Sequence, residues 1–176
     1  MEPASIILAV TGGIAAFKSA ALTSQLVQRG HQVRVVMTSS AEQFVGRPTF
    51  RALTGQRVVT DLYDPEFSLG AHIELARHYD VLCVAPATAN FMGKAAQGIA
   101  DDLLTTLYLC FTKRVVIAPA MNVEMWNHRA VQRNLQQLVD DGVEIIEPQE
   151  GWLSCRVEGK GRMAEPAQIL EQLTRD

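Results

Sequence analysis

The 176-residue sequence has little of what marks a secreted, membrane-bound or nucleic-acid-binding protein. Its three cysteines, Cys83, Cys110 and Cys155, are odd in number and far apart, which argues against a disulfide framework or a CxxC-type zinc site. No apolar run approaches the roughly 20 residues that span a bilayer, and no basic region precedes the first apolar stretch, as it does in a signal peptide. The net charge of −3 gives no electrostatic reason to bind nucleic acid or an anionic membrane. We therefore expect a reduced, cytoplasmic protein without a metal site.

The composition is otherwise that of an ordinary globular protein. Hydrophobic residues make up 48% of the chain and charged residues 20%. A chain of this length can bury a sizeable core, so we expect residues 1–176 to fold as a single domain.

Short apolar runs alternate with helical segments along the chain. Gly30 and Gly142 are expected to end helices, Pro166 to begin the terminal helix, and Asn127 to cap the helix that precedes Gly142. The predicted strands are 5–11, 32–37, 81–85, 115–118 and 143–147, with a further strand suggested over 58–62. The predicted helical segments are 14–29, 38–44 with its cap, 47–56 (helical or irregular), 72–78, 90–97, 102–112, 127–141 and the segment from 166.

Strands that alternate with crossover helices predict an α/β fold with a parallel, doubly wound sheet. The expected arrangement is flavodoxin-like or Rossmann-like, with three layers. Open sheets of this kind bind ligands outside the carboxyl ends of their strands. The residues that follow the predicted strands are therefore the first candidates for a functional site.

The turn after the first strand, Thr11-Gly12-Gly13-Ile14-Ala15-Ala16, is not the GxGxxG motif of dinucleotide-binding proteins. A glycine pair at a strand-to-helix turn still lets backbone N–H groups approach one phosphate at the helix N-terminus. Thr38 and Ser39 leave the neighbouring strand and offer hydroxyls to the same crevice. A phosphate held by backbone and hydroxyls, without an arginine fork, suits a mononucleotide such as FMN. The alternative is a tight turn that needs glycine for its backbone alone.

The octapeptide Pro119-Ala120-Met121-Asn122-Val123-Glu124-Met125-Trp126 leaves the strand predicted over 115–118. It places the amide of Asn122 between two methionines and beside a tryptophan. That arrangement suits a carboxylate or amide group held against an apolar, planar partner. The alternative is a loop whose methionines and tryptophan cap the core. The segment Pro86-Ala87-Thr88-Ala89-Asn90 leaves the strand predicted over 81–85 in the same way.

His72 differs from the other histidines because it begins a short helical segment after the glycine-containing loop 68–71. His31, His78 and His128 are most simply solvated. An imidazole exchanges a proton near neutral pH, so His72 is a candidate acid or base. A lone histidine can also be purely structural, and this alternative stays open.

Cys155 differs from the other two cysteines in its surroundings. It lies in the glycine- and charge-rich stretch 153–163, whose cationic neighbours favour the thiolate form and access to substrate. Cys83 and Cys110 lie inside apolar runs and behave as small hydrophobes. The charges of 153–163 could instead only solvate a surface loop.

Taken in order, His72 and the segments 86–90, 119–126 and 153–163 resemble the motifs of the homo-oligomeric flavin-containing cysteine decarboxylases. The resemblance runs from residue 6 to residue 163, and it points to the members that act on 4′-phosphopantothenoylcysteine in coenzyme A biosynthesis. It implies an FMN-dependent carboxy-lyase that forms 4′-phosphopantetheine. It also implies a homotrimer, or a multiple such as a dodecamer, whose active sites combine residues from neighbouring subunits. The apolar stretch 103–111 is the candidate contact surface, although it could equally be a core helix.

The resemblance implies roles for individual residues. His72 and Cys155 are the expected catalytic residues, and Asn122 with Met121 the expected substrate-binding residues. The residues expected to contact FMN are Gly12, Gly13, Thr38, Ser39, Pro86, Ala87, Thr88, Ala89, Asn90 and Ala120.

The sequence departs from the family pattern at several positions. Gly13, Phe91 and Arg156 stand where relatives often have serine, threonine and glycine, respectively, while Thr88 and Ser154 replace a serine and an alanine. The stretch 98–105 also resembles the family, and its carboxylates Asp101 and Asp102 could simply cap the next helix.

The implied chemistry explains why these residue types occur together. Direct decarboxylation of a C-terminal cysteine would leave a carbanion without an electron sink. Flavin oxidation of the CH2–SH group to a thioaldehyde places C=S β to the carboxylate, so that carbon dioxide can leave and an enethiolate forms. The reduced flavin then returns a hydride. In the family the histidine at the position of His72 is required for the oxidative decarboxylation, and Cys155 would supply the proton that accompanies reduction of the enethiol.

Retention of His72, Asn122 and Cys155 favours an enzyme over a non-catalytic FMN-binding regulatory subunit that binds a phosphatase, and over a flavodoxin-like electron carrier. A peptidyl-cysteine decarboxylase of antibiotic peptide maturation would use the same site. That alternative stays open, because the sequence of 149–163 does not reveal its substrate. The chain ends soon after its terminal helix, so we expect a free-standing decarboxylase without the C-terminal ligase domain found in part of the family, unless the sequence is a piece of such a longer protein.

Overall fold

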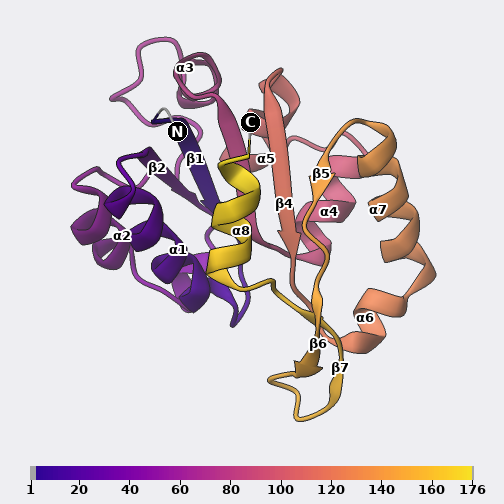
Figure 1. Ribbon diagram of the computed structural model, residues 1–176. Coiled ribbons are helices and arrows are strands. Elements are labelled where there is room, and N and C mark those ends of the chain that lie inside the picture. Colours follow the sequence, from indigo (N-terminus) through magenta and orange to yellow (C-terminus); the bar gives the residue numbers. More distant parts are fainter. Residues whose placement is uncertain (1–2, 176) are drawn as a thin grey trace.

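The computed structural model describes residues 3–175 and contains a five-stranded parallel sheet in the order β2-β1-β3-β4-β5 (Figure 1). All four neighbouring pairs of strands are parallel, which confirms the predicted doubly wound α/β fold. The strands are β1 (Ser5–Val10), β2 (Gln32–Met37), β3 (Val81–Ala87), β4 (Arg114–Pro119) and β5 (Glu144–Ile145).

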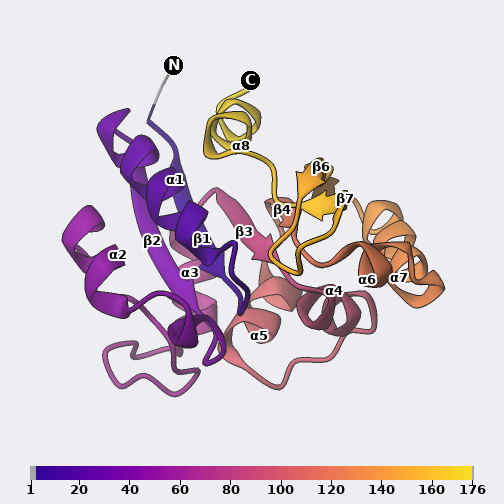
Figure 2. The same cartoon turned by 90° about the horizontal axis from the view of Figure 1, so that it is seen from below.

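Helices cover both faces of this sheet (Figure 2). The alternation of side chains along β1 divides the core, because Ile6 and Leu8 pack on one face and Ile7 and Ala9 on the other. One face is covered by α1 (Ala16–Gln28), α2 (Arg47–Thr54) and α8 (Pro166–Leu173). The other is covered by α3 (Ala71–His78), α4 (Ala89–Ala96), α5 (Leu103–Cys110) and α7 (Arg129–Asp140). Among residues 3–175, no helix has the length and apolar character needed to cross a membrane.

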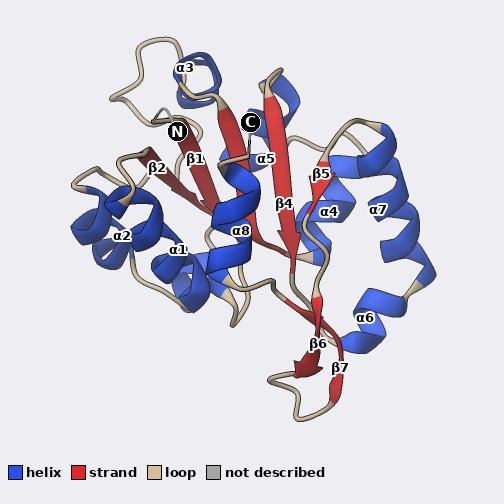
Figure 3. Ribbon diagram, viewed as in Figure 1, coloured by secondary structure: helices blue, strands red, loops and turns tan. Residues whose placement is uncertain are grey.

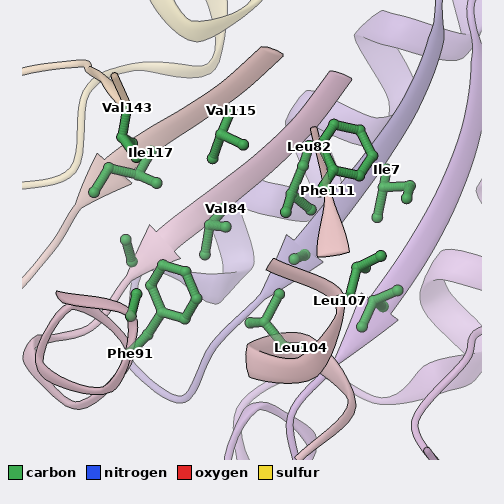
Figure 4. Packing of buried hydrophobic residues seen from close by; sticks show 14 of the residues in the cluster. Ile7, Leu82, Val84, Phe91, Leu104, Leu107, Phe111, Val115, Ile117 and Val143 are labelled. Atoms are coloured by element: carbon green, nitrogen blue, oxygen red, sulfur yellow. The ribbon is translucent and has the colours of Figure 1, made fainter. Parts of the chain in front are cut away.

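The apolar stretch 103–111 contributes mainly to the core. Leu104, Leu107 and Phe111 face the strand residues Leu82 and Val84, together with further apolar side chains of the sheet (Figure 4). This packing supports the interpretation of the stretch as a core helix. Of its large side chains, Leu109 is the one that points outward, with 51% of its surface exposed.

Several predicted elements differ in the structure. The strand suggested over 58–62 is a single bridge between Val36 and Val59, and the strand expected over 143–147 contains only two residues. Thr38 does lie before a short helical turn, where its Oγ1 accepts from the N–H of Ala41 at 3.3 Å, and this turn is the 3-10 helix η1 (Ala41–Gln43).

The prediction that Asn127 caps the helix after β4 is wrong. An additional short helix, α6 (Val123–Asn127), ends at that residue. The cap of α7 is His128, whose Nδ1 accepts from the N–H of Ala130 at 3.2 Å. The reason is that Asn122 starts a helix five residues earlier, so Asn127 belongs to the end of one helix and not to the start of the next.

The stretch 149–163, expected as a loop, forms an antiparallel hairpin beyond the carboxyl ends of the strands (Figure 3). Its strands are β6 (Gln149–Trp152) and β7 (Glu158–Arg162). Hairpin pairing satisfies the backbone groups of a segment that is too polar and glycine-rich to form part of the central sheet.

Candidate functional site

A cavity of about 760 Å³ lies at the carboxyl ends of the strands, beside the hairpin. Its size is typical of a small-molecule site, and its position is the one expected for ligands of an open α/β sheet. Its walls come from four strand-end segments, from the first turn of α5 and from the hairpin. The lining residues include 11–15, 17–18, 38–40, 88–91, 94, 102, 104–105, 120–122, 125, 152–155, 161–163 and 165.

The glycine turn after β1 has one position that requires glycine and one that leaves space. A Cβ on Gly12 would overlap the side chain of Ser40, so this glycine is needed for the tight turn itself. A Cβ on Gly13 would meet only the Cγ2 of Thr88, at 3.9 Å. None of the hydrogen bonds found within the described chain uses the N–H groups of Gly13, Ile14 or Ala15. The turn therefore presents free backbone donors at a helix N-terminus, which suits a phosphate.

Two threonines join the ends of β1 and β3. The hydroxyl of Thr11 donates to the carbonyl of Pro86 at 2.7 Å and accepts from the N–H of Thr88 at 3.1 Å. Thr88 caps α4 by accepting from the N–H of Phe91 at 3.3 Å. Both threonines line the cavity, whereas Pro86 and Ala87 are buried and do not.

Asn122 is the cap of α6 as well as a wall residue. Its Oδ1 accepts from the N–H of Met125 at 2.8 Å, which leaves the amide NH2 for a ligand. An NH2 group can only donate, so the ligand group it fits is a carboxylate or a carbonyl. Met121 and Met125 line the cavity beside it, as the sequence predicts.

The hairpin packs against the Asn122 segment through its glycines. The N–H of Met121 donates to the carbonyl of Gly161 at 3.0 Å, and a Cβ on Gly161 would overlap the Met121 carbonyl oxygen. A Cβ on Gly159 would come within 2.9 Å of the Cγ2 of Val123. Lys160, between the two glycines, pairs with Glu147 at 2.6 Å and lies 5.6 Å from the ring centroid of Trp126. These contacts place the segment that carries Cys155 beside Asn122.

The tip of the hairpin contains an unusual backbone conformation. Leu153 accepts from the N–H of Arg156 at 2.9 Å and donates to Val157 at 2.9 Å, a three-residue loop that prefers glycine at its left-handed position. Arg156 occupies that position with φ 65°, as the only non-glycine residue with positive φ in the described chain. The cost of this conformation is about 1–2 kcal/mol. Ser154 and Cys155, which precede it, line the cavity and are exposed.

Charged groups in the wall are paired with one another. Lys18, only 11% exposed, contacts Glu165 and the carbonyl of Met163, each at 2.9 Å. Arg162 lies 3.4 Å from the same carboxylate of Glu165. These contacts join α1 to the segment by which the chain leaves the hairpin.

A second ion pair involves the residues before α5. Lys94 contacts Asp101 at 2.7 Å and Asp102 at 3.6 Å, and the hydrogen bond to Asp101 raises the pKa of Lys94. Asp102 also accepts from the N–H of Thr105 at 2.8 Å as the cap of α5, which confirms the capping alternative for Asp102 but not for Asp101, whose partner is Lys94.

His72 lies apart from the cavity of its own chain. It is in the first turn of α3, which lies beside the amino ends of the strands, at the far end of the sheet from the hairpin (Figure 1). Its Nδ1 is buried and has no hydrogen-bond partner among the described residues. Its carbonyl accepts from the Sγ of Cys110 at 3.4 Å. The structure therefore brings Asn122, Met121 and Cys155 together and leaves His72 outside.

Sequence reasoning missed the contribution of Lys18, Glu165 and Trp152 to the wall. Trp152 is 66% exposed at the end of β6, next to the buried Leu153. An aromatic residue within a polar, glycine-rich stretch was the available signal for this residue. Lys18 and Glu165 gave no such signal, because their contact depends on how α1 and α8 pack.

Comparison with known proteins agrees with this geometry. The chain is 51% identical over 168 residues to the coenzyme A biosynthesis bifunctional protein CoaBC of Bacillus subtilis, covering 95% of this chain and 41% of the relative. It is 46% identical over 167 residues to the protein of the same name from Vibrio cholerae, covering 94% and 42%. The chain thus spans about two fifths of the length of these relatives.

Solved structures share the fold over almost the whole chain. A PPC decarboxylase variant complexed with pantothenoylaminoethenethiol has a TM-score of 0.90 at 33% identity, covering 98% of this chain and 97% of the other. The FMN-dependent cysteine decarboxylase SpaF has a TM-score of 0.85 at 38% identity, covering 96% and 94%. The family model described as Flavoprotein matches residues 1–176, and the chain therefore belongs to the Flavoprotein family.

Proposed function

We propose that this chain is an FMN-dependent decarboxylase that converts 4′-phosphopantothenoylcysteine to 4′-phosphopantetheine in coenzyme A biosynthesis. The observation that carries the proposal is one cavity in which three features meet. They are the free N–H groups after β1, the unused amide NH2 of Asn122 and the thiol of Cys155. The relatives named for coenzyme A biosynthesis and the PPC decarboxylase structure support this substrate.

The residues at the strand ends fit FMN. The N–H groups of Gly13, Ile14 and Ala15, with the hydroxyls of Thr38 and Ser39, would hold its phosphate. Further cofactor contacts are proposed for the lining residues Gly12, Thr88, Ala89, Asn90 and Ala120. When bound, FMN supplies reversible two-electron oxidation of the substrate's CH2–SH group.

Asn122 would position the substrate. Its NH2 group donates to the carboxylate of the cysteine end, while Met121 and Met125 exclude water from the apolar side of that group. A fixed donor orients the carboxylate that leaves as carbon dioxide.

Cys155 would act in the second half of the reaction. Reduction of the enethiol needs one proton at carbon, and the Cys155 thiol on the cavity wall can deliver it. Replacement by serine offers a much weaker acid, so we expect Cys155→Ser to release carbon dioxide once per site and then stop. The measurement is anaerobic mixing with stoichiometric substrate, followed by mass spectrometry of the accumulated product. Its mass should be two units below that of the saturated thiol. Saturated thiol formed at the wild-type rate would contradict the role.

His72 would act on a neighbouring subunit's site, since it lies outside the cavity of its own chain. We therefore include a homotrimer, or a multiple of one such as a dodecamer, in the proposal. A buried imidazole nitrogen without a partner in the described chain is consistent with a ligand or proton donor supplied by another copy.

The proposed activity is tested by anaerobic incubation of the protein and FMN with 4′-phosphopantothenoylcysteine, with carbon dioxide followed by mass spectrometry. We expect release without an external electron acceptor, because the oxidation and the later reduction balance within one turnover. A strict need for oxygen or a nicotinamide cofactor would contradict the proposal.

A second candidate function follows from the similarity to SpaF, an FMN-dependent cysteine decarboxylase. It is the decarboxylation of a peptide that ends in cysteine, as in the maturation of antibiotic peptides. Presenting such a peptide in parallel with the small substrate distinguishes the two functions. Turnover of the peptide alone would favour this second function.

A further inference from the structure

We propose that Arg156 is a specificity-determining residue that binds the phosphate of the substrate at the mouth of the cavity. The inference rests on the proposed function and deepens it. It assigns the substrate class as a phosphorylated small molecule and not a peptide ending in cysteine. Arg156 directly follows Cys155 at the tip of the hairpin, where the two preceding residues line the cavity.

The backbone at Arg156 is strained, and no hydrogen bond or ion pair of its side chain within the described residues offsets that strain. The three-residue loop of the hairpin needs a left-handed residue at this position, and glycine adopts that conformation at no steric cost. The arginine side chain is exposed, and none of the hydrogen bonds or ion pairs recorded for residues 3–175 involves its guanidinium. A strained residue that stabilises nothing within the chain indicates a role toward a ligand.

Arg156 is not itself a lining residue of the cavity, but it directly follows the lining residue Cys155 and differs from the nearby cations in its pairing. Lys18 and Arg162 both contact Glu165, at 2.9 and 3.4 Å. Lys94 contacts Asp101 at 2.7 Å, and Lys160 contacts Glu147 at 2.6 Å. Each of these cations therefore has a carboxylate of the chain as a partner, although Lys18 and Arg162 share that of Glu165. Among the described residues of the cavity wall and the hairpin, the guanidinium of Arg156 has no such partner.

The chemistry of the two substrate classes makes this charge selective. The cysteine carboxylate is common to both, and Asn122 is the group proposed to hold it. The phosphorylated small molecule carries a second, doubly charged anion at its other end, which a guanidinium binds through paired N–H groups. In a peptide that ends in cysteine, the polypeptide chain continues where the small substrate has its phosphate, so the peptide offers no phosphate to Arg156.

The experiment compares 4′-phosphopantothenoylcysteine with pantothenoylcysteine as substrates. For each, kcat/KM is measured for the wild-type holoenzyme and for Arg156→Gln, Arg156→Gly and Arg156→Lys. We expect the ratio of kcat/KM, phosphorylated over unphosphorylated, to fall by about tenfold in the first two variants. The change should appear in KM, because a contact remote from the reacting carbon is equal in the ground and transition states. Arg156→Lys, which keeps the charge, should retain most of the ratio.

Two features of the design separate the possible outcomes. Arg156→Gly relieves the strained backbone, so a loss of the ratio in this variant cannot come from a damaged hairpin. Glu158→Gln changes a charge on the same hairpin and is expected to keep the wild-type ratio. An unchanged ratio in Arg156→Gln and Arg156→Gly would overturn the assignment, as would equal losses on both substrates. No carbon dioxide from either substrate with the wild-type protein would instead refute the proposed function on which the assignment rests.

Discussion

The cavity has two walls that are built in different ways. The sheet wall, residues 11–15, 38–40 and 88–91, consists of segments fixed by the ends of parallel strands and by their hydrogen bonds. The hairpin wall, residues 152–155 and 161–163, consists of a polar segment held against Met121 and Val123 by close glycine contacts. The sheet wall is thus a consequence of the fold, whereas the hairpin wall depends on one docking contact. In the proposed function, the sheet wall binds the cofactor and the hairpin wall determines substrate specificity.

The largest expected effect concerns His72, which would show that the two walls of one chain do not make a complete active site. His72→Asn should lower turnover by about a thousandfold, the range for loss of a general acid or base, while FMN stays bound. If neighbouring copies share a site, mixed oligomers of His72→Asn and Cys155→Ser should regain about a quarter of wild-type steady-state turnover, because that share of sites combines intact residues. The measurement is turnover after co-expression. No recovery would mean that both residues serve the same chain's site.

The next effect separates the walls directly by adding one methyl group to each. Gly12→Ala forces an overlap with Ser40 and should cause loss of FMN. Gly161→Ala forces an overlap with the Met121 carbonyl and should retain FMN while turnover falls by about a hundredfold, since a small misplacement of the hairpin is enough. Flavin absorbance after gel filtration and kcat/KM give the two readouts.

The control for this pair is Gly30→Ala. It has φ 85° and no atom within 4 Å of an added Cβ, so it carries backbone strain without an overlap and lies away from the cavity. It should lower stability only and leave both readouts intact. If Gly12→Ala and Gly161→Ala had the same effect on FMN retention and on kcat/KM, the two walls would not differ in function.

A smaller effect sharpens the role of the segment between the walls. Asn122→Asp keeps the cap of α6, because aspartate accepts the N–H of Met125 equally well. It places a carboxylate against the substrate's carboxylate, so we expect KM to rise by about tenfold or more with the thermal midpoint unchanged. Asn122→Ala, which also loses the cap, should in addition lose about 1 kcal/mol of stability. Equal KM values for wild type and Asn122→Asp would move the substrate anchor elsewhere.

The smallest effect concerns stability at the hairpin tip. Arg156→Gly removes the left-handed strain and should stabilise the hairpin by about 1 kcal/mol. Slower amide hydrogen exchange over residues 149–162 would report this, whereas the exchange of β1 and β3 should not change. Faster exchange in the hairpin would show that the arginine side chain stabilises the tip through contacts of its own.

The sequence predicts the sheet wall much better than the hairpin wall. The apolar run of β2 follows Gly30, and the apolar run of β3 ends at Pro86, so both the strands and the residues that follow them can be located. The hairpin sequence has no alternation of apolar and polar residues that would predict its strands. Its position depends instead on close contacts of Gly159 with Val123 and of Gly161 with Met121. That complementarity exists only after the chain has folded.

Two single residues show the same limit. The sequence predicts the side chain of Asn122 as a substrate-binding group, but its role as the cap of α6, which leaves only its NH2 unused, depends on the backbone of that helix. The resemblance predicts a catalytic role for His72, but its place at the opposite end of the sheet from the cavity cannot be predicted from the local sequence. Sequence patterns identify chemistry at strand ends, but they do not show which end of the sheet, or which copy, a helical residue serves.

The docking of the hairpin through its base has an evolutionary consequence. Gly159, Lys160 and Gly161 carry the contacts with the body of the protein, while the tip from Ser154 to Val157 makes few of them. Substitutions or insertions at the tip can therefore accumulate without disturbing the sheet or the strand-end turns. A protein organised in this way can exchange one substrate for another while it keeps its cofactor chemistry.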